Sequence, residues 1–193
     1  MKVLITGAKG QLGRGLIATA PSTVDLHPVT RDDCDLADAS TIAALIKQVA
    51  PDLVINAAAY TAVDKAERDE DAAHAINAGA VAALVAAHRG KLVHVSTDFV
   101  FDGTSSRAYR PDDSRNPISV YGRSKAEGED CLRDTDLLVR TSWVYTAGGA
   151  NVERTMPPPM GESPQLHVRG TIVRPPTWAA CPRPHVRAWG GGG

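Results

Sequence analysis

The feature that most constrains the fold is a regular alternation of short apolar runs with longer helical stretches over the first 145 residues. The apolar runs are rich in branched side chains, which is typical of strands buried on both faces. Such alternation predicts an α/β fold, a doubly wound parallel sheet with helices on both faces. The predicted strands span 2–6, 24–29, 52–58, 91–96 and 137–141, and the predicted helices span 11–20, 40–50, 69–88 and 120–133.

Composition indicates what kind of partner the chain binds. The formal net charge is -1 and no block of like charges occurs, so we expect a small-molecule partner, no nucleic acid and no membrane. The opening MKVLITGAKG is too short in its apolar part for a secretion signal or a membrane span, and we expect a cytoplasmic location. Neither the histidines nor Cys34, Cys131 and Cys181 show a metal-ligand spacing, so we expect no metal site.

The glycine-rich stretch TGAKGQLG joins the first predicted strand to the first predicted helix. Glycine permits a tight turn and a close backbone approach, and the helix N-terminus favours a pyrophosphate. At this position the stretch predicts a Rossmann-type dinucleotide site, and a plain turn is the alternative. The residues expected to contact the cofactor here are Gly7, Gly10, Gln11, Leu12 and Gly13.

The end of the second predicted strand should lie against the adenosine ribose of the cofactor. An acidic residue there selects NAD, whereas a cation accommodates the 2′-phosphate of NADP. Arg31 precedes Asp32 and Asp33, which favours NADPH and leaves NADH open. Further cofactor contacts are expected in CDLAD and at the end of the third strand, at Asp35, Leu36, Ala57, Ala58, Ala59 and Tyr60.

Tyr121 and Lys125 lie four residues apart on a predicted helix, so their side chains share one face. A free phenol has a pKa of about 10, and a neighbouring ammonium group would lower that value. Such a pair can pass a proton to a carbonyl oxygen, and Thr97, which follows the fourth strand, could hold the same oxygen. The alternative is an ordinary exposed helix face.

Five stretches together resemble one family: TGAKGQLG, NAAAYTAVDKAE, STDFVFDG, NPISVYGRSKAEGE and RTSWVY. They are similar to the extended short-chain dehydrogenase/reductases and, within these, to the dTDP-4-dehydrorhamnose reductases. The resemblance implies a catalytic triad of Thr97, Tyr121 and Lys125, in which Tyr121 donates the proton and Lys125 also binds the nicotinamide ribose. It further implies a dTDP-sugar substrate that contacts Thr97, Asp98 and Trp143, and reduction of its 4-keto group to give dTDP-L-rhamnose.

Two other functions stay open at this point. An epimerase or dehydratase of the same superfamily would act on a nucleotide sugar without net consumption of NADPH. A non-catalytic regulatory subunit of the methionine adenosyltransferase type would bind a partner protein instead. The sequence does not decide the oligomeric state, and a homodimer is one option.

The segment after residue 145 breaks the alternating pattern. Eight of the chain's thirteen prolines follow residue 150, which leaves little room for a regular helix. We therefore assign residues 1–145 to the NAD(P)-binding domain and 146–193 to an irregular remnant of a substrate domain. The expectation is a truncated chain with an aberrant, out-of-frame tail, and a genuine short variant is the alternative. Either would leave the activity of the short chain open.

Overall fold

The computed structural model describes residues 1–142, 144–145 and 177–178. Five parallel strands form the central sheet in the order β2-β1-β3-β4-β5. This architecture confirms the predicted doubly wound α/β fold, because the chain winds outward from β1 to β2 and then from β3 to β5 on the other side. The strands are β1 (Lys2–Thr6), β2 (Asp25–Val29), β3 (Leu53–Asn56), β4 (Lys91–Thr97) and β5 (Leu137–Thr141).

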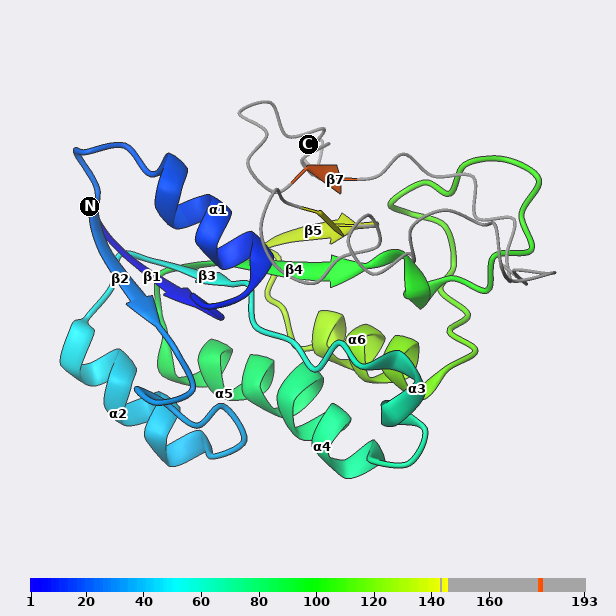
Figure 1. The fold of residues 1–193 in the computed structure, drawn as a ribbon, viewed down its shortest axis with the longest axis horizontal. Helices are drawn as coiled ribbons and strands as arrows, with labels where there is room; N and C mark the ends of the chain where they lie inside the picture. The colour runs from blue at the N-terminus through cyan, green and yellow to red at the C-terminus, as the bar shows by residue number, and fades with distance from the viewer. Residues whose placement is uncertain (143, 146–176, 179–193) are drawn as a thin grey trace, which may run out of the picture.

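Helices cover the two faces of this sheet unequally. Of the helices that the structure describes, α1 packs on one face, and the other long helices pack on the opposite face (Figure 1). The main core lies on the second face, where Leu4 and Val54 of the sheet meet Ile42 and Leu84. The helical elements are α1 (Gln11–Thr19), α2 (Ala39–Val49), α3 (Val63–Ala66), α4 (Glu70–His74), η1 (Ala75–Gly79), α5 (Ala80–Ala87), η2 (Asp98–Val100) and α6 (Val120–Asp130).

The single helix predicted over 69–88 is wrong in one respect, because a π-helical turn, η1, interrupts it. Asn77 in this turn is 1% exposed, and its Oδ1 accepts a bond from the Tyr60 N–H at 2.9 Å. Its Nδ2 donates to the Tyr60 carbonyl oxygen at 3.1 Å and to Ser124 Oγ at 3.0 Å. The π turn thus carries a fully bonded amide that ties the loop after β3 to α6.

A second, two-stranded sheet pairs β6 (Val144–Tyr145) with β7 (Thr177–Trp178) in parallel. Apart from β7, the segment 146–193 lies outside the described residues, and so do Trp143 and Cys181. The expectation of an irregular remnant domain therefore stays a prediction for most of that segment. In the part of the chain that the structure covers, we find no helix long and apolar enough to cross a membrane.

Candidate active site

A cavity of about 590 Å³ opens at the carboxyl ends of the sheet strands. Its lining includes Thr6 at the end of β1, Thr97 at the end of β4 and Thr141 at the end of β5. The loop after β3 supplies Ala57, Ala58 and Ala59. The cavity therefore spans the point between β1 and β3 where the chain reverses its winding direction, which is where ligands of open α/β sheets bind.

The glycine loop brings the backbone of β1 against the loop after β3. Gly7 adopts a φ of +71°, and a Cβ on this residue would lie 2.8 Å from backbone atoms of Ala57 and Ala58. A Cβ on Gly13 would lie 2.3 Å from the Gly7 carbonyl oxygen, so α1 can approach the loop only with glycine there. Among the described residues no side chain caps the start of α1 at Gly10, and this helix end faces the cavity.

Three charged residues follow β2. The cation, Arg31, faces the cavity, whereas the two acids, Asp32 and Asp33, are bonded to other residues. Asp33 accepts bonds from the Thr30 N–H at 2.8 Å and the Thr30 hydroxyl at 2.7 Å, and these bonds lower the pKa of its carboxyl. Asp32 forms an ion pair with Lys9 of the glycine loop. Arg31 lines the cavity and has no ion-pair partner among the described residues.

Thr97, Tyr121 and Lys125 lie together in the cavity wall, as the resemblance implies. Two caps position α6: Ser119 Oγ accepts from the Gly122 N–H at 3.0 Å, and Glu67 Oε1 accepts from the Val120 N–H at 2.8 Å. All three wall residues are buried, with Tyr121 8% and Lys125 1% exposed. Their burial shields them from bulk water, and all three line the same cavity.

The structure corrects the predicted electrostatics of Tyr121. Burial raises the pKa of this phenol, and it is the hydrogen bond with the Thr97 side chain, not an ammonium group, that lowers it in part. Lys125 Nζ instead donates to the Val95 carbonyl oxygen at 2.7 Å and lies 3.2 Å from His94 Nε2. Burial lowers the pKa of Lys125 to about 8, and the nearby Glu129 carboxylate partly opposes that shift.

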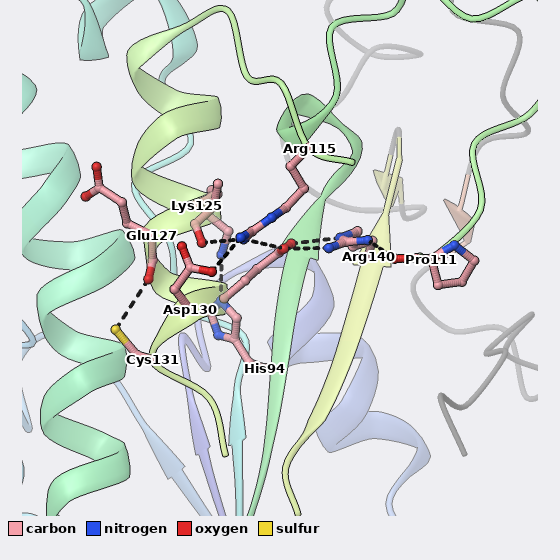
Figure 2. Close-up of polar contacts among 10 residues, drawn as sticks. His94, Pro111, Arg115, Lys125, Glu127, Asp130, Cys131 and Arg140 are labelled. Carbon is pink, nitrogen blue, oxygen red and sulfur yellow. Dashed lines mark hydrogen bonds and ion pairs between the residues drawn. The ribbon is translucent and has the colours of Figure 1, made fainter. Parts of the chain in front are cut away.

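A buried ion-pair cluster fixes the far end of α6 (Figure 2). The Glu129 side chain is 3% exposed and accepts from Arg140 of β5 at 2.6 Å and from Arg115 at 3.2 Å. Arg115 belongs to the loop that precedes α6 and also donates to the Ala126 carbonyl oxygen at 2.7 Å. Because this loop, α6 and β5 are joined here, the cluster holds the helix that carries Tyr121 and Lys125 in register with the sheet.

Most of the residues predicted from sequence meet in this cavity, and some do not. Tyr60, Asp35 and Gly13 do not line the cavity. The Tyr60 hydroxyl donates to Asp69 Oδ2 at 3.0 Å, and Asp35 accepts from the Ala37 N–H. Gly13 packs against the backbone of Gly7 in the glycine loop. Trp143 lies outside the described residues. The predicted residues that line the cavity are Gly7, Gly10, Gln11, Leu12, Arg31, Leu36, Ala57, Ala58, Ala59, Thr97, Asp98, Tyr121 and Lys125.

Several lining residues had not been singled out as site residues. Lys9 lies inside the glycine motif, and Phe99 directly follows Asp98. Their positions next to predicted site residues could have indicated that they line the cavity. The ring of Phe99 meets Tyr121 edge-on, with 5.5 Å between the ring centroids. Ile76, by contrast, comes from the π turn, which no sequence pattern indicated.

The residues present fit a dinucleotide. Ser96 lines the cavity, is 3% exposed, and its hydroxyl has no hydrogen-bond partner among the described residues. A buried hydroxyl without a partner is costly, and a polar ligand in the cavity would supply one. A Cβ on Gly7 or Gly13 would fill the space of the glycine loop. The uncapped start of α1 and the cation of Arg31 are both suited to phosphate groups.

Comparison with known sequences gives consistent relatives. Residues 1–181 match the family described as the RmlD substrate binding domain. A dTDP-4-dehydrorhamnose reductase of Burkholderia thailandensis is 42% identical over 185 residues, which cover 93% of this chain and 62% of that protein. A dTDP-4-keto-6-deoxy-D-glucose reductase of Streptomyces niveus is 40% identical, with 79% of this chain and 56% of that protein covered.

Solved structures agree with these relatives in fold. A dTDP-4-dehydrorhamnose reductase from Clostridium acetobutylicum superposes with a TM-score of 0.78 at 39% identity, covering 81% of this chain and 58% of that one. The Bacillus anthracis reductase in complex with NADP has a TM-score of 0.77 at 36% identity, covering 80% and 58%. The chain thus spans less than two thirds of the length of these relatives.

Proposed function

This chain belongs to the RmlD substrate binding domain family, and from that premise we propose that it is an NADPH-dependent dTDP-4-dehydrorhamnose reductase. The proposed reaction reduces the 4-keto group of dTDP-4-dehydrorhamnose and yields dTDP-L-rhamnose. The observation that carries the proposal is the convergence of Thr97, Tyr121 and Lys125 on a cavity that also contains the glycine loop. The Burkholderia thailandensis and Streptomyces niveus relatives are both named as reductases of dTDP-linked sugars, which supports the same substrate class.

The cofactor would be held along the lining from the glycine loop to α6. Gly7 and the start of α1 would hold the pyrophosphate, and Arg31 would hold the 2′-phosphate of NADPH. Lys125 would bind the nicotinamide ribose. When bound, NADPH supplies the hydride that reduces the carbonyl carbon.

The acid of the reaction is Tyr121. A carbonyl that accepts a hydride needs a proton on its oxygen, and burial keeps the Tyr121 phenol protonated well above neutral pH by raising its pKa. The Thr97 hydroxyl bonds the phenol, and its single proton, which is donated to Asp98 Oδ1 at 3.1 Å in this structure, would turn to the same substrate oxygen. Asp98, which is buried beside Thr97, and Trp143 would contact the sugar.

Three wider features belong to the proposal. The dTDP moiety would be bound outside the reacting centre, where its binding energy helps to position the sugar. A cytoplasmic location is part of the proposal, because the proposed substrate and cofactor are small molecules of the cytoplasm. A homodimer is retained as the hypothesis for assembly.

The test follows the absorbance of reduced nicotinamide with purified protein, NADPH and enzymatically generated dTDP-4-dehydrorhamnose. The proposal expects oxidation of NADPH that depends on the sugar nucleotide and yields dTDP-L-rhamnose. Parallel reactions with NADH and with dTDP-4-keto-6-deoxy-D-glucose measure the preference for cofactor and for sugar. Conversion of the sugar without net NADPH oxidation would identify an epimerase or dehydratase, and binding of NADPH without any conversion would contradict a reductase.

A further inference from the structure

A chain of buried polar side chains runs behind the cavity wall from β1 to α6. The Thr6 hydroxyl donates to Asn56 Oδ1 at 2.6 Å, Asn56 Nδ2 lies 3.1 Å from His94 Nδ1, and His94 Nε2 lies 3.2 Å from Lys125 Nζ. Thr6 and His94 are 0% exposed, and Asn56 and Lys125 are 1% exposed. Figure 2 shows the His94 ring next to the Lys125 side chain. The sequence pattern indicated only a packed histidine here.

The orientation of the Asn56 amide is fixed by its neighbours. Its Oδ1 accepts from the Ala58 backbone N–H at 3.3 Å in addition to the Thr6 hydroxyl. A backbone N–H can only donate, so the atom facing it must be the amide oxygen. The amide nitrogen therefore faces His94, and it too can only donate.

This orientation determines which nitrogen of His94 carries the proton. Because Asn56 Nδ2 donates, His94 Nδ1 must offer its lone pair and carries no hydrogen. The imidazole is uncharged, because its burial, the largest cause of the shift, holds the pKa of His94 far below neutral pH. A neutral ring with a bare Nδ1 bears its proton on Nε2, the nitrogen that faces Lys125.

The Nε2–H group of His94 and an ammonium at Lys125 are both donors, so they cannot bond to each other. An uncharged amine at Lys125 resolves the conflict, because its lone pair accepts from Nε2–H while it donates to the Val95 carbonyl oxygen. We propose that His94, oriented by Asn56, is a positioning residue that presents Nε2–H to Lys125 and favours its uncharged amine form. The use of that amine in proton transfer rests on the reductase function proposed above, but the geometry of the pair does not.

The other groups around Lys125 oppose this effect only weakly. Glu129, one turn further along α6, favours the ammonium form, but Arg115 and Arg140 engage its carboxylate. Tyr121 on the same helix is an uncharged phenol near neutral pH. Asp98, the acid next to Thr97, accepts bonds from the Thr97 and Ser142 hydroxyls. Both forms of Lys125 therefore coexist near pH 8, so this residue can take up and return a proton.

The first test determines the tautomer of His94 directly in the chain without any substitution. Protein with ¹⁵N-labelled histidine is observed by NMR through the ring nitrogens, without cofactor or substrate. The proposal expects His94 to be neutral at pH 7 with its proton on Nε2. A proton on Nδ1, or on both nitrogens, would overturn it, because Nε2 would then accept from Lys125 or the ring would be charged. Failure of the reductase assay would leave this result unaffected.

The second test follows the ammonium of Lys125 by NMR with ¹⁵N-labelled lysine during a pH titration. Asn56→Asp replaces the donor at His94 Nδ1 by an acceptor, which moves the ring proton to Nδ1 and turns Nε2 into an acceptor. The midpoint of Lys125 should then rise by about one pH unit, a tenfold gain in proton affinity. Asn56→Asp in the His94→Phe background retains the added charge without the tautomer change. An equal rise in both backgrounds would contradict the proposal.

Discussion

Lys125 Nζ donates to the carbonyl oxygen of Val95 at 2.7 Å, and this bond joins the middle of α6 to the cavity end of β4. An amine 1% exposed is an expensive group to bury, because folding removes its ammonium form from water. The position is thus favourable for chemistry and unfavourable for stability. Such a conflict is expected where a residue is retained for function.

Lys125→Met should stabilise the fold and remove the proposed activity. The pKa of Lys125 falls from 10.5 to about 8 on folding, which costs about 3 kcal/mol at pH 7. An uncharged side chain should recover this free energy, minus about 1 kcal/mol for the lost bond to the Val95 carbonyl oxygen. Between pH 8 and 10.5 the unfolded parent binds more protons than the folded parent, so the parent gains stability with pH and the advantage of the variant shrinks. Denaturant titrations at pH 7 and pH 10 measure both values. A variant less stable than the parent at pH 7 would contradict this prediction.

His94 should make the chain less stable in acid. Its pKa is lowered from 6.5 to about 2, so below pH 6.5 the unfolded chain binds a proton at this ring that the folded chain does not bind. Each pH unit below 6.5 should cost about 1.4 kcal/mol of unfolding free energy from this one group. Unfolding measured from pH 6.5 to 4.5 for the parent and for His94→Gln isolates the contribution of the His94 ring, because all other titratable groups are common to the two proteins. Parallel pH profiles for the two proteins would argue against a neutral buried ring.

The glycine loop offers a matched pair of substitutions. Gly7 and Gly103 both have positive φ, at +71° and +78°, but an added Cβ meets the backbone of Ala57 and Ala58 at 2.8 Å in the first case and no atom within 4 Å in the second. Gly103→Ala should therefore cost about 1 kcal/mol, for the backbone conformation alone. Gly7→Ala should cost clearly more and weaken NADPH binding. Calorimetric NADPH affinity and thermal unfolding of both variants test this, and equal losses would show that the close approach to the loop after β3 is unimportant.

Arg31→Ala should change the choice of cofactor rather than the chemistry. An arginine that contacts the 2′-phosphate contributes a charged hydrogen bond that NADH cannot use. We expect the dissociation constant of NADPH to rise about tenfold, which corresponds to roughly 1.4 kcal/mol, while that of NADH changes little. Calorimetry with both nucleotides measures the ratio, and NADH serves as the internal control. Equal weakening of both would indicate that Arg31 does not contact the 2′-phosphate.

The fold could be predicted because its signals are local and repeated. Branched apolar runs and intervening helical patterns identified all five strands of the central sheet, with ends within one residue for β1, β2, β4 and β5 and within two residues for β3. The interruption at Asn77 could not be predicted, because a π turn depends on partners in the loop after β3 and in α6. The same holds for α3, which was not expected.

Most of the residues that line the cavity could be predicted from sequence, but the electrostatics of Tyr121 could not. Helical spacing correctly placed Tyr121 and Lys125 on a common wall of the cavity. It could not reveal that the Lys125 amine turns to Val95 and His94, since both partners come from a strand about thirty residues earlier. Burial, which determines the pKa shifts of both residues, is likewise a property of the packed structure.

The central claim is that Tyr121 is the acid of a reductase, and Tyr121→Phe tests it most directly, because the change removes one hydroxyl and keeps the ring. Oxidation of NADPH by the parent, by Tyr121→Phe and by the control Tyr109→Phe, whose hydroxyl bonds Asp102 in the loop before α6, is followed with dTDP-4-dehydrorhamnose. We predict substrate-dependent oxidation by the parent and the control, and a loss of at least about 100-fold in Tyr121→Phe with NADPH affinity unchanged. Undiminished oxidation in Tyr121→Phe would contradict the account.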